Sequence, residues 1–210
     1  TEEGRMTELP AAAARAPGAG ASHDAGNDPM DDAGELLAVL RDVGLDRKAE
    51  LVDGEVHVMS PTDDTAGRCA ENVYLALRAH EGAGGGRARG DNHAFLVSLP
   101  GRRSFSPDAS FSRGPAAGRG AVRGAPDFAV EVRSAGDYGA RMEEKLARKR
   151  ADYFAAGTQV VWDVDPDGGD TIRVYRAARP EAPDVYRRGE TAEAEPAVPG
   201  WRFPVDDLFR

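Results

Sequence analysis

Three charged residues lie where a plain hydrophobic core would have apolar side chains, and together they suggest hydrolysis at a metal ion. They are Asp108, Glu131 and Lys149. Two carboxylates that face one another need a cation between them, and carboxylate oxygens are the ligands that hard divalent ions prefer. A lysine beside such an ion can hold a water molecule or stabilise developing negative charge. We therefore expect the stretch from Pro107 to Gly157 to carry the chemistry.

Glu131 lies within a stretch that alternates between two faces. Phe128, Val130 and Val132 fall on one face, and Glu131 and Arg133 fall on the other. A period of two predicts a strand, and its apolar residues favour a central position in the sheet. A buried carboxylate there requires a cation or strong hydrogen bonds. The alternative is a solvent-facing pair of Glu131 and Arg133.

Lys149 falls on the apolar stripe of a predicted helix. Met142, Leu146, Lys149 and Tyr153 follow helical spacing, which directs all four toward the sheet. An isolated lysine on such a stripe more often extends along its stem to reach water. A lysine and a glutamate that both point into the layer between helix and sheet would neutralise one another, which favours the site.

Asp108 and Glu50 are weaker candidates when each is taken alone. Asp108 follows Pro107 and opens a short predicted strand, Ala109 to Phe111, but an aspartate after proline is also typical of turns. Glu50 begins a predicted hairpin, Glu50 to Met59, whose turn is Asp53-Gly54. Its side chain could point into the site or into solvent.

The remaining elements predict an α/β fold, a mixed β-sheet flanked by helices with a β-hairpin extension at each end. We expect one domain over residues 31–210 after a disordered tail, residues 1–30, which has almost no large apolar side chains. The expected helices are Asp31 to Arg41, Ala66 to His80 with Cys69, Val73, Leu75 and Leu77 facing the core, and Gly139 to Ala156. A glycine-rich loop is expected from Glu81 to Gly86. The other expected strands are His93 to Leu99, Gln159 to Val164, and an edge hairpin of Thr171 to Arg176 and Asp184 to Arg187, before a terminal cap from Pro199 to Leu208.

Composition limits the classes of protein and of site. The single cysteine among 210 residues excludes internal disulfides and cysteine-based zinc clusters, and it fits a cytoplasmic protein. The four histidines lack ligand spacing, so a site for Mg²⁺ or Mn²⁺ built from carboxylates is favoured over zinc. No apolar run has the length of a membrane span. The formal charge of −9 argues against a nucleic-acid partner.

A glycine-rich stretch between the two acidic strands offsets part of that charge. It carries Arg113, Arg119 and Arg123, which could contact phosphate groups. The simpler interpretation is a mobile, solvated loop. The predicted helix after it adds Arg141, Lys145, Arg148 and Arg150, a second basic surface.

From about Leu45 to the C-terminus the chain resembles the Uma2 putative restriction endonuclease family (domain of unknown function 820), a branch of the PD-(D/E)XK nuclease superfamily. The likeness is carried by Glu50-Leu-Val-Asp-Gly54-Glu, Met59-Ser-Pro61, Pro107-Asp108, Val130-Glu131-Val-Arg-Ser134, Asp137, Lys149-Arg-Ala-Asp-Tyr153-Phe-Ala-Ala-Gly157, Val161-Trp162 and Asp165-Pro166. The resemblance implies a restriction-endonuclease-like core in which Asp108 and Glu131 match the metal-binding acids. The superfamily's usual lysine position is Arg133 here, and Lys149 matches a lysine supplied by the helix. The histidine expected after Pro61 is missing.

The resemblance implies a Mg²⁺-dependent or Mn²⁺-dependent endonuclease that hydrolyses DNA. Asp108, Glu131 and Lys149 would be catalytic, and Glu50 and Arg133 would orient the acids or bind phosphate. The alternative is a catalytically degenerate binding or regulatory module, in which these side chains form a closed ion-pair network. Hydrolysis of RNA or of nucleotides is a third interpretation. A homodimer would suit cleavage of both strands of a duplex.

Overall fold

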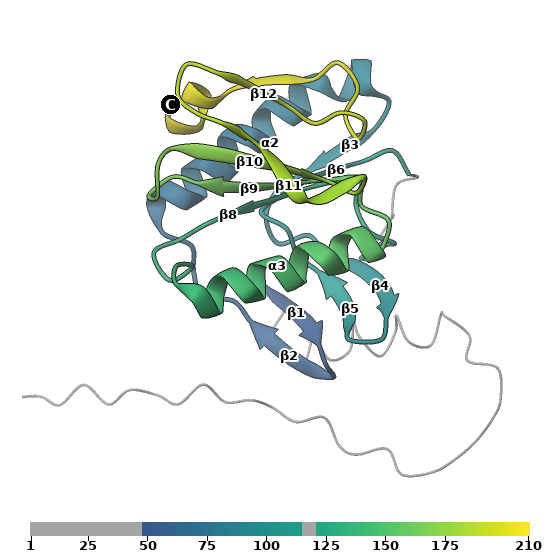
Figure 1. The fold of residues 1–210 in the computed structure, drawn as a ribbon. Coiled ribbons are helices and arrows are strands. Elements are labelled where there is room, and N and C mark those ends of the chain that lie inside the picture. The colour runs from purple at the N-terminus through teal and green to yellow at the C-terminus, as the bar shows by residue number, and fades with distance from the viewer. Residues whose placement is uncertain (1–47, 115–120) are drawn as a thin grey trace, which may run out of the picture.

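The computed structural model describes residues 48–114 and 121–210 (Figure 1). The predicted tail 1–30, the predicted helix from Asp31 to Arg41, and Arg119 lie outside the described residues. No helix in the described part of the chain is long and apolar enough to cross a membrane. The α/β fold class is confirmed, because helices flank mixed sheets and strands alternate with them along the chain.

A six-stranded sheet forms the centre of the molecule, with the order β11-β10-β9-β8-β6-β3. Within the described part of this sheet only β8 and β9 pair in parallel, and the chain between them forms helix α3 (Ala140–Ala155). The strands at Phe128 and at Gln159 that we predicted to be central are β8 and β9, which are paired on both sides. The sheet consists of β3 (Arg87–Arg89), β6 (Ala109–Ser112), β8 (Phe128–Val132), β9 (Val160–Asp165), β10 (Thr171–Arg176) and β11 (Arg179–Tyr186).

Two smaller sheets extend this core. The predicted hairpin at Glu50 is confirmed, since Asp53 and Gly54 have φ angles of 51° and 78°, as a two-residue turn with left-handed residues requires. It belongs to a second sheet, the hairpin sheet, which consists of β1 (Ala49–Val52), β2 (Glu55–Val58), β4 (Phe95–Leu99), β5 (Arg102–Phe105) and β7 (Val122–Arg123). The C-terminal cap consists of β12 (Thr191–Glu193), β13 (Arg202–Pro204) and the 3₁₀ helix η1 (Val205–Phe209).

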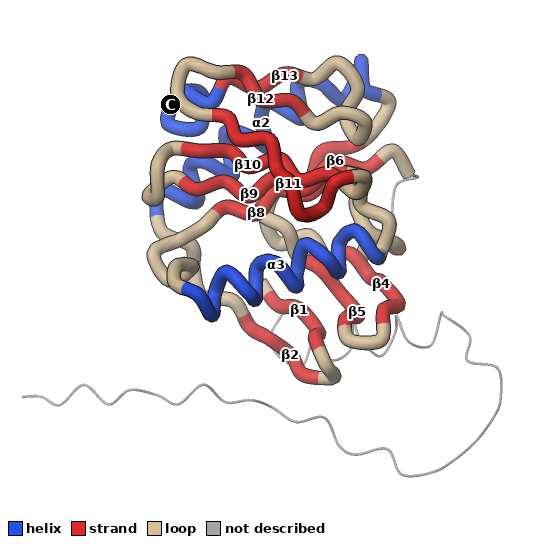
Figure 2. The backbone as a smooth tube through the Cα atoms, in the orientation of Figure 1, coloured by secondary structure: helices blue, strands red, loops and turns tan. Residues whose placement is uncertain are grey.

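The helices lie on opposite sides of the six-stranded sheet (Figures 1 and 2). Helix α2 (Asp64–Gly84) packs on the face that carries Phe128, Val130 and Val132, together with the C-terminal cap. Helix α3 (Ala140–Ala155) runs across the other face, between that sheet and the hairpin sheet. On this face a second hydrophobic cluster, which includes Phe105, Ala129 and Tyr153, connects the hairpin sheet, the six-stranded sheet and α3. The second face is therefore the one on which polar residues of β8 can meet α3.

The predicted stripe of α3 is confirmed. Met142, Leu146 and Lys149 are half-buried, and Tyr153 is buried. The predicted helix end is also correct, because Gly157 takes a positive φ of 103°.

Helix α2 departs from the sequence prediction at its end. The predicted loop from Glu81 to Gly86 is wrong, since the helix continues to Gly84 and ends only at the left-handed Gly85. The Glu81 side chain accepts a hydrogen bond from the Ala88 backbone amide at 2.7 Å, which fixes this last turn onto β3. The prediction that Leu75 faces the core is also wrong, because this residue is 61% exposed.

Candidate active site

Asp108 directly precedes β6, and Glu131 lies on the neighbouring strand β8 of the central sheet. Ala109 pairs with Val130, so one step further in the same antiparallel register Asp108 lies opposite Glu131. The Asp108 amide donates to the carbonyl of Val130 at 3.0 Å, and the Val132 amide donates to Asp108 Oδ2 at 2.7 Å. The backbone of β8 therefore fixes the Asp108 carboxylate.

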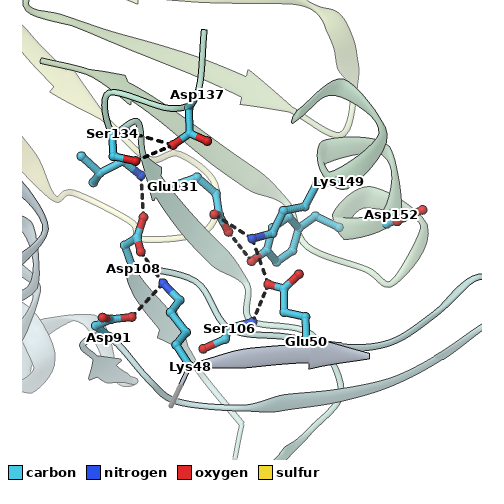
Figure 3. A network of polar contacts seen from close by, with 12 residues as sticks. Lys48, Glu50, Asp91, Ser106, Asp108, Glu131, Ser134, Asp137, Lys149 and Asp152 are labelled. Atoms are coloured by element: carbon cyan, nitrogen blue, oxygen red, sulfur yellow. Dashed lines mark hydrogen bonds and ion pairs between the residues drawn. The ribbon is translucent and has the colours of Figure 1, made fainter. Parts of the chain in front are cut away.

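Lys149 brings its ammonium from α3 to Glu131 (Figure 3). Its Nζ lies 2.8 Å from Glu131 Oε2 and 2.9 Å from Glu50 Oε1, and the side chain is only 13% exposed. Lys149 therefore points into the molecule, as the stripe predicted. The hydroxyl of Tyr153, one turn further along α3, donates to Glu131 Oε1 at 2.7 Å. The structure thus brings Glu50, Glu131 and Lys149 together.

Glu50, whose direction the sequence left open, is only 3% exposed and points inward. Its Oε2 accepts from Arg102 at 2.7 Å, and its Oε1 accepts from the Ser106 amide at 2.9 Å. Arg102 also donates to Asp152 of α3 at 2.8 Å. These contacts attach the hairpin sheet to α3 and place its acid beside Lys149.

Lys48 is a site residue that the sequence reasoning missed. Its Nζ donates to Asp108 Oδ1 and lies 2.8 Å from Asp91 Oδ1. The available signal was its spacing, since Lys48 and Glu50 are two residues apart and so fall on one side of an extended chain. The site therefore has two ammonium groups, one for each acidic strand.

The pKa values of Glu131 and Glu50 are shifted in opposite directions. Burial raises the pKa of Glu131, and the nearby carboxylates of Asp108 and Glu50 raise it further against the opposing effect of Lys149. Burial also acts to raise the pKa of Glu50, but Lys149 and Arg102 outweigh it, and the pKa lies below its usual range. Burial and the neighbouring carboxylates therefore raise the pKa of Glu131 by more than Lys149 lowers it.

Lys149 itself is held in the charged form. Burial acts to lower its pKa, but Glu131 and Glu50 outweigh burial and raise the pKa above its usual range. Burial and Glu131 likewise raise the pKa of Tyr153, so its hydroxyl remains a donor. Both groups that contact Glu131 from α3 are therefore hydrogen-bond donors at neutral pH.

Arg133 lies beside Glu131 on the same face of β8 but contacts other acids. Its guanidinium donates to Asp163 at 2.6 and 2.7 Å and also to Glu143. Asp163 is the register partner of Glu131 on β9. Arg133 therefore neutralises Asp163, the acid next to Glu131 across the sheet, and its described contacts do not reach Asp108 or Glu131.

A small cavity of about 10 Å³ lies beside Glu131 and Asp163 and is about the size of one water molecule. Its lining includes Glu131, Lys149, Tyr153 and Asp163.

The basic surfaces predicted around the site are partly neutralised within the chain. The Arg113 guanidinium lies 3.6 Å from Asp127, and Arg148 binds Asp53 at 2.9 Å. Arg150 lies 3.5 Å from Asp163 with little exposure. Arg123, Arg141 and Lys145 are exposed.

The carboxylate oxygens of Asp108 and Glu131 are ligands of the kind that a hard divalent ion prefers. Each carboxylate offers about four lone-pair positions. Lys48 and Val132 use one on each oxygen of Asp108, and Lys149 and Tyr153 do the same at Glu131. Lone pairs therefore remain for a cation, which would offset the neighbouring carboxylates of Asp108 and Glu50 that raise the pKa of Glu131. Within the described residues no three Asp, Glu, His or Cys side chains group as a metal site.

Comparisons with known proteins identify the family and the fold of the chain. A family model described as Uma2, putative restriction endonuclease, matches residues 35–206. A solved structure, described as a putative nuclease belonging to DUF820 from Anabaena variabilis, is similar with a TM-score of 0.61 and 20% identity. The match covers 77% of this chain and 89% of that one, and it shows a shared fold. None of the curated proteins matches.

Proposed function

This chain belongs to the Uma2 family of putative restriction endonucleases, and from that premise we propose that it is a Mg²⁺-dependent endonuclease that hydrolyses phosphodiester bonds of DNA. The observation that carries the proposal is the meeting of Asp108 and Glu131 on adjacent strands with Lys149 from α3 at 2.8 Å from Glu131. The residues come from separate parts of the chain, which supports a built site over a chance surface group.

Asp108 and Glu131, with the backbone carbonyl of Val132, would hold Mg²⁺ or Mn²⁺. When bound, the ion would supply charge stabilisation at the scissile phosphate and would make the attacking water more acidic. The Val132 amide keeps Asp108 oriented, and Tyr153 orients Glu131. These contacts would set the acids in place before an ion arrives.

Lys149 would act as a cation and hydrogen-bond donor. Its raised pKa keeps the ammonium protonated at neutral pH, so it would position the attacking water and stabilise charge on the phosphate. A lysine that stays protonated does not act as the base that removes the proton of the water. Glu50 would hold Lys149, and Arg133 would neutralise Asp163 so that Glu131 does not face a second uncompensated acid.

A cleavage assay with a panel of divalent ions tests the proposal. The substrates are single-stranded and double-stranded DNA and RNA, each with Mg²⁺, Mn²⁺, Ca²⁺ or EDTA. We expect cleavage of DNA with Mg²⁺ or Mn²⁺ only, and its loss in Asp108→Asn and in Glu131→Gln. Lys145→Met, which removes an exposed lysine from the same helix as Lys149, should cleave normally. Cleavage that persists in both acid variants would reject these residues as the catalytic site.

A non-catalytic binding or regulatory module is the second candidate. It is favoured by the two ion pairs of the site, Lys48 with Asp108 and Lys149 with Glu131, because each acid already has an ammonium partner without an ion. The net charge of −9 also favours it, because nucleic-acid affinity depends mostly on phosphate neutralisation. This candidate predicts no cleavage and no stabilisation by Mn²⁺.

A further inference from the structure

Arg89 is a buried arginine that has no hydrogen-bond or ion-pair partner among the described residues. It lies on β3 at the edge of the central sheet and is 8% exposed. Its Nη1 is buried and has no hydrogen-bond partner, and among the described residues its guanidinium forms no ion pair. The contact that remains is the ring of Phe95, whose centroid lies 5.7 Å from Cζ.

That contact does not balance the burial of the charge. A cation over an aromatic ring contributes on the order of 0.5–2 kcal/mol. Removing an ionised group from water costs several kcal/mol even after the protein relaxes. Burial, with the neighbouring charge of Arg87, accordingly lowers the pKa of Arg89 against a smaller opposing effect of Glu81. The guanidinium is therefore in an environment that favours an anion beside it.

Two buried hydroxyls without partners lie on the same side of the sheet. Arg89 pairs with Ser110 and Arg87 pairs with Ser112, so all four side chains project from one face. The Oγ atoms of Ser110 and Ser112 are buried and have no hydrogen-bond partner. Directly opposed residues in antiparallel strands have Cβ atoms about 5 Å apart. A guanidinium and a hydroxyl at this spacing can both donate to one tetrahedral anion.

This group lies next to the candidate active site. Asp108 is two residues before Ser110 on β6, on the same face and about 7 Å along the strand. In the turn after β3, Asp91 follows Arg89 by two residues, and its carboxylate is held by Lys48, which also binds Asp108. The separation between Asp108 and Ser110 is similar to that between neighbouring phosphates of one nucleic-acid strand.

We propose that Arg89 and Ser110 bind a phosphate group, and that its source is the phosphodiester beside the one at Asp108 and Glu131. The second part rests on the proposed function. Arg89 would supply charge and two donors, and Ser110 a hydroxyl donor. The site gives an acidic protein one preformed contact to the backbone of its substrate.

Thermal unfolding with inorganic phosphate tests the site without metal or cleavage. The melting temperature of the wild-type protein should rise with phosphate concentration, because the ligand binds the folded state. The rise should be lost in Arg89→Met and reduced in Ser110→Ala. Arg87→Met is the matched control, since Arg87 is exposed on the same strand and face, and it should keep the rise. Without phosphate, Arg89→Met should melt at the wild-type temperature or higher, because an unpaired buried charge is removed.

A second arm identifies the source of the phosphate. Binding of a short single-stranded oligonucleotide in EDTA should weaken about tenfold in Arg89→Met, the loss expected for a charged hydrogen bond. A neutral methylphosphonate analogue should bind both proteins equally. If phosphate stabilises the wild type but the oligonucleotide binds both proteins alike, the site takes a free anion and the second part is wrong. If phosphate has no effect and Arg89→Met melts lower, Arg89 is structural and the site is rejected, whether or not the protein cleaves DNA.

Discussion

Lys149 and Glu131, which come from a helix and from the strand before it, meet with 2.8 Å between Nζ and Oε2. The same ammonium lies 2.9 Å from Glu50 of the hairpin sheet. One lysine therefore neutralises acids from two different sheets, and its helix fills the layer between them. Stability and any chemistry at Glu131 should both depend on this one side chain.

Removing the Lys149 charge should destabilise the protein strongly. Lys149→Met leaves Glu131 and Glu50 buried beside one another with less compensation, and loss of one partner of a buried pair costs about 3–5 kcal/mol. Denaturant unfolding would measure the loss, with Lys145→Met as control on the exposed side of α3. Adding Glu131→Gln to Lys149→Met should recover part of the stability. A loss below about 1 kcal/mol, the value of an exposed pair, would contradict the buried arrangement.

Stability should depend on pH through Glu50. Its pKa is lowered by Lys149 and Arg102 against burial, so the ionised form stabilises the fold. That contribution is complete above the pKa of the unfolded chain, about 4.3, and is lost as pH falls through the lower value in the folded protein. Glu50→Gln should therefore be less stable at neutral pH and lose less stability on acidification. Parallel pH profiles of unfolding free energy for the two proteins would refute the role of Glu50.

The Tyr153 hydroxyl can be separated from the Tyr153 ring. Tyr153→Phe keeps the stacking on Phe105, whose ring centroid lies 3.9 Å away, but removes the donor to Glu131. A hydrogen bond to a charged group contributes about 1.5–3 kcal/mol, so a loss of that size is expected in chemical denaturation. Tyr74→Phe, on α2, should change little. An unaltered free energy of unfolding in Tyr153→Phe would mean that the hydroxyl does not support Glu131.

Lys48 should oppose metal binding at Asp108. Its ammonium contacts the same carboxylate that would hold the ion. Lys48→Met should therefore bind Mn²⁺ more tightly, by about an order of magnitude, while the protein without metal becomes less stable. Lys48→Arg should resemble the wild type. Weaker Mn²⁺ binding in Lys48→Met would instead show that Lys48 serves mainly to orient Asp108.

The sequence predicted the parts of the site that local periodicity controls. The alternation from Phe128 to Arg133 placed Glu131 on the face opposite the main core, and the helical stripe placed Lys149 toward it. The direction of Glu50 depended on tertiary contacts with Arg102 and Lys149, which no local pattern contains. Lys48 was missed for the same reason, because its partners Asp91 and Asp108 are distant in sequence.

Composition was misleading where tertiary contacts outweighed it. Glycines at 82 and 84 predicted a loop, but the contact between Glu81 and Ala88 extends α2 through them. Strand β5 was not predicted, because Arg102 and Ser104 look solvated by type. Both are buried, and Arg102 is neutralised by Glu50 and Asp152.

Calorimetric titration with Mn²⁺ tests most directly whether Asp108 and Glu131 form a metal site. The account predicts that the wild-type protein binds the ion and that Asp108→Asn and Glu131→Gln lose this binding. Glu144→Gln, an exposed acid on α3, should bind as the wild type does. Equal Mn²⁺ binding by the wild type and both site variants would contradict the account.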